Sequence, residues 1–187
     1  MHIYYTNVFT NKEGESHRLL ERAIAQFLGE DSRESAAELV ADIEIGEMGK
    51  PDIPGFNDFS ISHSENGWAV LIADGYGAEY YCGLDIQFSR NADVNKLAER
   101  WYHENEAAAV KQLGEEEFFR IWARREALVK AVGTSIVNAH LPDTLAAEVE
   151  FEGDKWQIRD MKIAALDGAY VAVCAKDIKD IKVIELD

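Results

Sequence analysis

Three short segments of this chain carry side chains that suit phosphate and metal chemistry. Residues 59–64 read Phe-Ser-Ile-Ser-His-Ser and place three hydroxyls and an imidazole close together. Residues 83–87 place Asp85 inside an otherwise apolar strand, and further along Glu126 and Lys130 stand one helical turn apart. Carboxylates hold Mg²⁺, and hydroxyl or cationic groups hold phosphate oxygens. The three segments predict a divalent-metal site beside a phosphate-binding loop, which suits group transfer from a diphosphate ester.

Asp85 and Gln87 are the first candidate metal ligands. Successive side chains of a strand point to opposite faces, so these two share one face while Leu84 and Ile86 point into a core. A carboxylate buried in a strand costs free energy unless it is paired or bound to a metal. The alternative is an edge strand on which Asp85 is merely solvated.

Glu126 is the second candidate carboxylate. It shares a helix face with Lys130, and such a pair alone describes an ordinary surface ion pair worth about 0.3–0.5 kcal/mol. Trp122, one turn earlier on the core-facing stripe, indicates instead that Glu126 lies at the rim of buried surface. From there the carboxylate could join Asp85 on Mg²⁺, which takes oxygen ligands in near-octahedral geometry.

The serine-rich segment has a structural alternative, because such stretches are often turns and a single histidine is more often structural than functional. Ser62 and His63 nevertheless close a strand before the turn at Asn66-Gly67, where their donors could meet phosphate oxygens. The chain has no Walker P-loop, Gly-X-Gly-X-X-Gly motif, zinc-type Cys/His spacing or Gly-X-Ser-X-Gly elbow. These absences disfavour Rossmann-type nucleotide binding, a zinc enzyme and an α/β-hydrolase.

The charge and composition of the chain limit the classes of partner that it is expected to bind. The 187 residues carry a formal net charge of −16, which disfavours nucleic acid because its binding depends on Lys and Arg. An anionic ligand would need locally concentrated positive charge or a metal. Cys82 and Cys174 lie in apolar runs, as buried thiols in a reducing compartment do. No apolar run approaches ~18 residues, so we expect a soluble cytoplasmic protein without membrane attachment. We take it to be a monomer.

Periodicity and turn residues predict an α+β chain with a seam near residues 86–92. The expected helices are 15–28, 33–43 (capped by Asp31), 93–101, 104–113 and 115–132. The expected strands are 1–9, 59–62, 67–73, 79–86, 147–152, 155–163, 169–175 and 181–186, with a Gly/Pro-punctuated loop at 46–58. We expect the C-terminal strands to form an antiparallel meander.

In this order and spacing, the motifs resemble those of the Sfp-type 4′-phosphopantetheinyl transferases. The signatures of that family are Gly-Lys-Pro, Phe-Asn-X-Ser-His-Ser, Gly-(Ile/Val)-Asp-(Ile/Val)-Glu, Phe-Phe-X-X-X-Glu and Trp-X-X-Lys-Glu-X-X-X-Lys. They are matched in turn by residues 49–51, 59–64, 83–87, 101–106 and 122–130. The resemblance implies two similar α+β halves related by a pseudo-twofold, each a small antiparallel sheet packed with helices; here they would be residues 1–87 and 88–187.

The resemblance also implies a reaction. Coenzyme A and Mg²⁺ would bind between the halves, and a serine of an acyl or peptidyl carrier protein would take 4′-phosphopantetheine from coenzyme A. Adenosine 3′,5′-bisphosphate would be released. By matching position, Asp85, Gln87 and Glu126 would hold the metal.

The same resemblance assigns the phosphate contacts and a base. Lys130 would stabilise the leaving phosphate, and Ser62 and His63 would contact phosphates of coenzyme A. Lys50 would lie near the adenosine end. Glu106 would be the general base for the serine hydroxyl, directly or through water.

Two departures from the family pattern stand out. Gln87 replaces a glutamate that many relatives carry, which removes one charge, and Arg125 replaces their lysine. Mg²⁺ and the nearby cationic groups would form a local positive pocket on an acidic protein, built from Lys50, His63, Arg125 and Lys130. Two other functions stay open: a Mg²⁺-dependent phosphohydrolase of a nucleotide or coenzyme A diphosphate, and a non-catalytic module that binds coenzyme A or a carrier protein.

Overall fold

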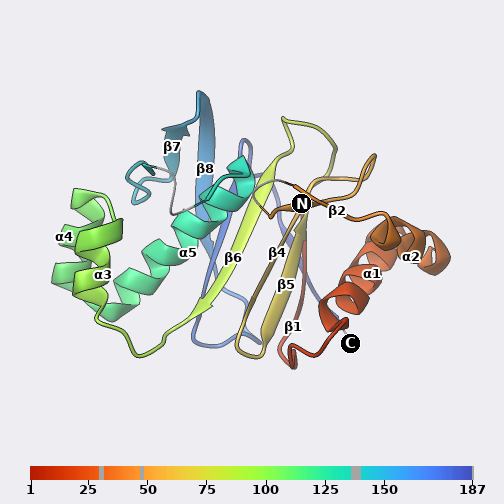
Figure 1. Ribbon diagram of the computed structural model, residues 1–187, viewed down its shortest axis with the longest axis horizontal. Coiled ribbons are helices and arrows are strands. Elements are labelled where there is room, and N and C mark those ends of the chain that lie inside the picture. The colour runs from red at the N-terminus through yellow and green to blue at the C-terminus, as the bar shows by residue number, and fades with distance from the viewer. Residues whose placement is uncertain (30–31, 47–48, 136–139, 187) are drawn as a thin grey trace.

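The computed structural model of the chain, which describes residues 1–29, 32–46, 49–135 and 140–186, contains two four-stranded sheets with helices packed against them (Figure 1). The predicted α+β class is confirmed. The helices are α1 (Glu15–Leu28), α2 (Arg33–Ala41), α3 (Val94–Trp101), α4 (Glu104–Leu113) and α5 (Glu115–Val132). Within the described ranges, none of them is both long and apolar enough to span a lipid bilayer.

The first sheet has the strand order β10-β1-β5-β4. Its members are β1 (His2–Thr6), β4 (Phe59–Ser64), β5 (Gly67–Ile72) and β10 (Lys182–Glu185). β1 and β4 both run antiparallel to β5, whereas β10 runs parallel to β1. Helices α1 and α2 cover one face of this sheet through an apolar cluster that includes Ile24 and Trp68.

The second sheet is antiparallel throughout and has the strand order β6-β9-β8-β7. Its members are β6 (Cys82–Phe88), β7 (Glu148–Phe151), β8 (Asp154–Met161) and β9 (Ala169–Ala175). Helix α5 packs on one face of this sheet, where Ala127 and Leu128 share a buried cluster with Ala172 and Cys174. Helices α3 and α4 pack beside α5 at the end away from α1 (Figure 1).

The faces of the two sheets that point away from these helices share one core. Ile3 and Leu71 from the first sheet join Leu84, Ile86 and Val173 from the second in a single buried cluster. The predicted inward direction of the two β6 residues is therefore confirmed. Because side chains alternate along a strand, the residue between them on β6 points to the opposite face, toward α5.

A row of side-chain hydrogen bonds joins the sheets where β4 and β6 lie side by side. Four β6 amides donate to oxygens that lie 24 positions earlier in the chain: Cys82 to Asp58 (2.8 Å), Leu84 to Ser60 (2.9 Å), Ile86 to Ser62 (3.1 Å) and Phe88 to Ser64 (3.4 Å). β6 is an edge strand of its sheet, and buried edge amides need partners. The alternating hydroxyls of β4 therefore have a structural role that the sequence analysis did not assign.

Three expectations about the elements need correction. The C-terminal strand β10 does not extend the predicted meander, because it pairs with β1 in the first sheet. Residues 46–58 are not wholly loop, since β3 (Pro51–Asp52) pairs with β2 (Glu44–Ile45). The strand expected at residues 79–86 is displaced, since β6 spans Cys82–Phe88 and lies in the second sheet; the division of the chain after residue 87 stays a prediction. The proposed cap Asp31 lies outside the described residues, and the pseudo-twofold stays a prediction.

Candidate functional site

Helix α5 lies directly on β6 because Gly83 has no side chain. A Cβ at this position would overlap the main-chain carbonyl oxygen of Ala127. The residues one turn before and one turn after Ala127 are also alanines, and all three are buried. Since residues four apart share a helix face, these small side chains keep α5 close to the strand over two turns. This close approach places Glu126 and Lys130 beside Asp85.

Asp85 is buried, with only 6% of its surface exposed, and its two carboxylate oxygens differ in their surroundings. Oδ1 accepts hydrogen bonds from the Ser62 hydroxyl at 2.9 Å and from the Lys130 ammonium at 2.7 Å. Oδ2 is buried and has no hydrogen-bond partner among the described residues. Burial raises the pKa of the Asp85 carboxyl, and Lys130 opposes that rise. A buried oxygen without a partner is the kind of atom that a bound cation would satisfy.

Gln87 and Glu126 face the same cavity as Asp85. The cavity has a volume of about 340 Å³, and Trp122 also lines it. Burial raises the pKa of the Glu126 carboxyl, and the nearby charge of Asp85 raises it further. The ion pair of Lys130 is formed with Asp85 rather than with Glu126. Two carboxylates that disfavour each other's ionisation would both be stabilised by a divalent cation between them.

The donor types at this cavity fit Mg²⁺ or Mn²⁺. Within the described part of the chain, no group of three or more His, Cys, Asp and Glu side chains could hold a metal. Mg²⁺ in phosphate-handling sites usually takes only one or two carboxylates and completes its coordination with water and phosphate oxygens. The amide nitrogen of Gln87 donates to the Phe88 carbonyl at 2.7 Å, which leaves the amide oxygen as the candidate ligand atom. Asp85, Glu126 and Gln87 thus remain the candidate metal ligands.

Ser62 and His63 point to opposite faces of β4. The Ser62 hydroxyl is buried, donates its single proton to Asp85 and accepts from the Ile86 amide. A hydroxyl has only one proton to donate, and Ser62 already donates it to Asp85. The expected contact between Ser62 and a phosphate stays a prediction. His63 is exposed, contacts the Phe9 ring and lines the cavity that Asp85 lines. The predicted contact of His63 with a phosphate stays a prediction.

Lys50 lies at the junction of the two sheets. Its ammonium donates to both carboxylate oxygens of Asp58, at 3.1 and 2.9 Å, and to the Cys82 carbonyl at 3.2 Å. It also lines a second cavity of about 320 Å³. Three residues line both cavities: Ile61, Glu126 and Lys130. A ligand longer than one cavity could therefore run along both.

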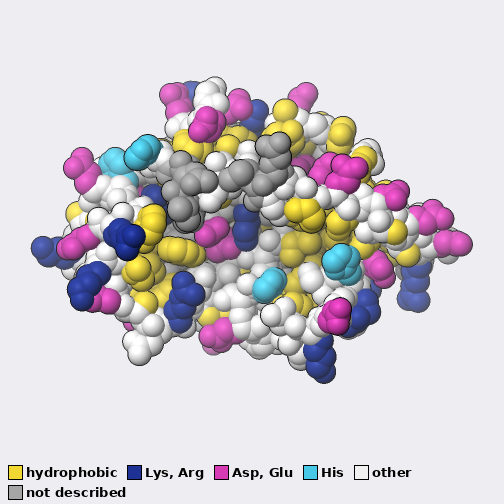
Figure 2. All heavy atoms as spheres, viewed as in Figure 1, with side chains coloured by type: hydrophobic (Ala, Val, Ile, Leu, Met, Phe, Trp, Pro, Cys, Tyr) yellow, Lys and Arg dark blue, Asp and Glu magenta, His cyan; other side chains and the backbone are white. Residues whose placement is uncertain are grey.

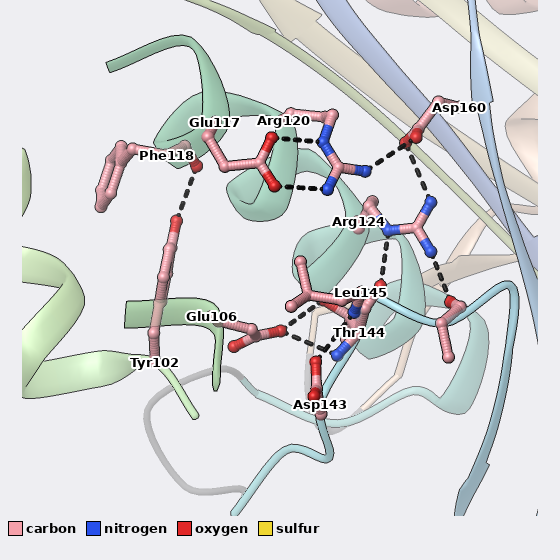
Figure 3. A network of polar contacts seen from close by, with 11 residues as sticks. Tyr102, Glu106, Glu117, Phe118, Arg120, Arg124, Asp143, Thr144, Leu145 and Asp160 are labelled. Atoms are coloured by element: carbon pink, nitrogen blue, oxygen red, sulfur yellow. Dashed lines mark hydrogen bonds and ion pairs between the residues drawn. The ribbon is translucent and has the colours of Figure 1, made fainter. Parts of the chain in front are cut away.

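Glu106 lies in a buried network that joins α4, α5 and the segment 141–146; Figure 3 shows its contacts with Thr144. Oε1 accepts from the Thr144 amide at 2.8 Å and from the Thr144 hydroxyl at 2.5 Å. Oε2 accepts from the His103 amide at 3.0 Å and from the Arg125 guanidinium at 2.5 Å. The side chain is fully buried and lines neither cavity. The general-base role of Glu106 stays a prediction, and this geometry does not add to it.

The positive pocket expected from the sequence is only partly formed. Arg125 lines neither cavity; it is 3% exposed and paired with Glu106. The cations that do line the cavities are Lys50, Lys130 and Arg90; the two lysines already have carboxylate partners, whereas Arg90 is exposed and forms no ion pair with another described residue. Arg125 was therefore wrongly placed in the pocket, and a bound metal would add its positive charge to that of Arg90.

Sequence reasoning missed Asp58, Arg124 and Thr144. Asp58 begins the row of acceptors along β4, and its spacing of two from Ser60 is a signal that could have been found. Arg124 donates to the Thr144 carbonyl at 2.6 Å and pairs with Asp160 (Figure 3). No local pattern pointed to Thr144, because its partners come from helices nearer the N-terminus.

The family match covers the segment that holds Asp85, Glu126 and Lys130, whereas Lys50, Ser62 and His63 lie before it. Residues 81–173 match the family model described as the 4′-phosphopantetheinyl transferase superfamily. A segment of 85 residues is 34% identical to the 4′-phosphopantetheinyl transferase HetI of Nostoc sp. (strain PCC 7120 / SAG 25.82 / UTEX 2576). That alignment covers 43% of this chain and 34% of the length of the curated relative. Residues 81–173, just under half of the chain, therefore match the domain of the 4′-phosphopantetheinyl transferase superfamily.

Proposed function

We propose that the protein transfers 4′-phosphopantetheine from coenzyme A to a serine of an acyl or peptidyl carrier protein in a Mg²⁺-dependent reaction. The serine Oγ forms a bond to the β-phosphorus of coenzyme A, and the bridging bond from that phosphorus to the leaving oxygen breaks. Adenosine 3′,5′-bisphosphate leaves, and the hydroxyl proton passes to a base or to solvent. The protein would thus act as a holo-carrier-protein synthase.

The observation that carries this proposal is that Oδ2 of buried Asp85 has no partner in the described part of the chain, while Asp85 lines the same cavity as Glu126. Both residues fall within the segment that matches the superfamily. When bound, Mg²⁺ would neutralise the charge that develops on the diphosphate during transfer. Asp85, Glu126 and Gln87 would hold it.

The chain's own cationic and polar groups would bind the rest of the ligand. Lys130, whose ammonium lies 2.7 Å from Asp85, would stabilise the leaving phosphate. His63 would contact a phosphate from the exposed side of β4. Lys50 lines the second cavity, which would take the adenosine end of coenzyme A.

The direct test is intact-protein mass spectrometry of apo-carrier proteins after incubation with coenzyme A, Mg²⁺ and this protein. We expect the carrier to gain the mass of one phosphopantetheine group, and EDTA should abolish the gain. Asp85→Asn is the matched negative control, because it keeps the shape of the side chain but removes its charge.

Two outcomes would overturn the proposal. Coenzyme A that is cleaved while every carrier stays unmodified would indicate a Mg²⁺-dependent phosphohydrolase. Coenzyme A that stays intact, with carrier or coenzyme A bound tightly, would indicate a non-catalytic binding module.

A further inference from the structure

The direction in which Glu126 points is linked to the contacts of the two residues before it. Consecutive side chains on an α-helix diverge by about 100° around its axis. Arg124 reaches segment 141–146 and strand β8, and Arg125 reaches α4 and the end of α3. Glu126 then faces the cavity of Asp85. Fixing the two arginines therefore fixes the rotation of α5 about its axis.

The contacts of Arg125 are buried and directional. One guanidinium nitrogen donates to Glu106 Oε2, and another donates to the Trp101 carbonyl at 2.8 Å. The guanidinium also stands 5.1 Å from the centre of the Tyr102 ring. Arg125 is 3% exposed and Glu106 is 0% exposed. Removing one member of such a pair would leave the other as an uncompensated buried charge.

Glu106 is itself held from the opposite side. It is the third residue of α4 and accepts from the His103 amide, which completes a capping box at the start of that helix. Its other oxygen accepts two hydrogen bonds from Thr144, whose carbonyl in turn accepts from Arg124 (Figure 3). The carboxylate thus joins α4, α5 and segment 141–146 at one buried point.

We infer that Glu106 is a positioning residue for the metal site and that it acts through Arg125 on the orientation of Glu126. This inference rests on the proposed function in one respect, namely that Glu126 is a metal ligand. It differs from the general-base role that the family resemblance suggested. A base must reach the hydroxyl whose proton it takes, whereas both Glu106 oxygens are engaged inside the protein and neither cavity includes this residue.

Glu106→Gln separates the two roles, because it keeps the shape of the side chain and removes the charge that holds Arg125. The first readout is the dissociation constant of Mn²⁺, measured by electron paramagnetic resonance with neither coenzyme A nor carrier present. We expect it to rise about tenfold, as is typical when a group that orients metal ligands is lost. The second readout is the pH–rate profile of transfer, whose acid limb should stay where it is in the unsubstituted protein. Added Mn²⁺ should restore most of the lost rate.

Three further variants keep the test interpretable. Glu104→Gln removes one exposed charge from the same helix and should change neither readout. Tyr102→Phe removes the hydrogen bond to the Phe118 carbonyl but keeps the ring beside Arg125, so it should lower stability without changing the Mn²⁺ constant. If Glu106→Gln does not fold, Thr144→Val removes only one of the hydrogen bonds to Glu106 and should shift Mn²⁺ binding in the same direction by a smaller factor.

An unchanged Mn²⁺ dissociation constant in folded Glu106→Gln would overturn the inference. So would a rate that stays low at every Mn²⁺ concentration together with a displaced acid limb, which is the behaviour of a lost base. A protein that binds Mn²⁺ through Asp85 and Glu126 but transfers nothing would overturn the proposed function instead. The Mn²⁺ comparison would still decide the role of Glu106 in that case.

Discussion

At the scale of single residues, the site depends on how one carboxylate is divided between two environments. Among the described residues, Asp85 Oδ1 has two donors and Oδ2 has none, although both belong to one buried group. Lys130 therefore compensates the charge from one side only. The other side faces a cavity where a divalent cation would complete the compensation.

Asp85→Asn should reduce transfer by at least about a hundredfold, because the chemistry is electrostatic and the substitution removes the charge that would hold the metal. The fold should persist, since the amide keeps the size of the side chain and can still accept from Lys130. Steady-state kinetics with circular dichroism would check both statements. Asp177→Asn, an exposed position, is the matched control. Rates equal to those of the control would remove Asp85 from the metal site.

As the pH falls, metal binding at this site should weaken at a higher pH than it would at carboxylates with ordinary pKa values. The pKa values of Asp85 and Glu126 are both raised, mainly by burial, and a metal needs both groups deprotonated. Protons therefore begin to compete with the metal at a higher pH than the usual carboxyl range. Mn²⁺ titrations at about pH 5 and about pH 7.5 should give a weaker constant at the lower value. Equal constants would mean that neither carboxyl titrates in this window.

The raised pKa of Asp85 also affects the stability of the metal-free protein. As the pH rises, metal binding strengthens, whereas the stability of the metal-free fold falls. A raised folded-state pKa means that the native protein binds the Asp85 proton more tightly than the unfolded chain does. The contribution of Asp85 to the free energy of unfolding therefore falls as pH rises from the ordinary value of 3.8 toward the raised one. Bound metal should remove this loss.

The types of the site residues were more predictable than their surroundings. Asp85, Glu126 and Lys130 could be selected because strand alternation and helical spacing are local properties of the sequence. The burial of Glu106 and Arg125 could not be predicted from the sequence, because it depends on Thr144, which lies 38 positions beyond Glu106. A capping box at His103 and Glu106 was the one local sign of a structural role.

At the scale of elements, the contact between α5 and β6 sets the geometry of the site. Residues on the helix and on the strand come within reach because backbone meets backbone at Gly83. The helix bounds were predictable: α1 and α5 begin and end where periodicity and terminal glycines placed them. The role of Gly83 was not predictable, since the sequence around a strand does not show which helix will pack on it.

Gly83→Ala should move α5 away from β6 and destabilise the protein by about 1–3 kcal/mol, as overpacked cores usually are. Transfer activity should fall as well, because the shift separates Glu126 and Lys130 from Asp85. Urea unfolding and steady-state kinetics would measure the two effects. The double variant Gly83→Ala/Ala127→Gly should be no better, because the overlap is with the main-chain carbonyl of Ala127. Recovery in the double variant would contradict this account of the packing.

At the scale of the whole molecule, an anionic ligand must approach an acidic protein. The net charge is −16, and Figure 2 shows acidic side chains gathered over the α1–α2 end of the visible face. Of the described cations at the cavities, Lys50 and Lys130 are already paired with carboxylates, which leaves Arg90. Long-range repulsion should therefore slow the encounter with coenzyme A at low salt.

The association rate of coenzyme A should rise between about 20 mM and about 200 mM salt, because the Debye length shortens from about 20 Å to about 7 Å and the repulsion is screened at shorter range. Stopped-flow measurement with a fluorescent coenzyme A analogue would give the rate directly. An inert uncharged crowding agent controls for changes in viscosity. A rate that falls with salt would mean that local cations dominate the approach.

The strands of the molecule were predictable as strands, but their partners were not. β10 was expected beside β9 and instead lies beside β1, at the far edge of the other sheet. Alternation of apolar and polar residues reports that a segment is extended; it does not report which neighbour it meets. Pairing between distant segments is decided by the assembled core.

The row of side-chain acceptors between β4 and β6 divides the amides of one strand into two sets. One set donates to side-chain oxygens of residues 58–64 and consists of the amides of Cys82, Leu84, Ile86 and Phe88. The amides between them point toward β9 in their own sheet. Deuterium should enter the first set whenever the two sheets separate, and the second only when the sheet itself unfolds. Residue-resolved exchange should then alternate along β6, and a ligand bound across both sheets should slow the first set selectively. A uniform exchange rate along β6 would mean that the sheets part only on complete unfolding.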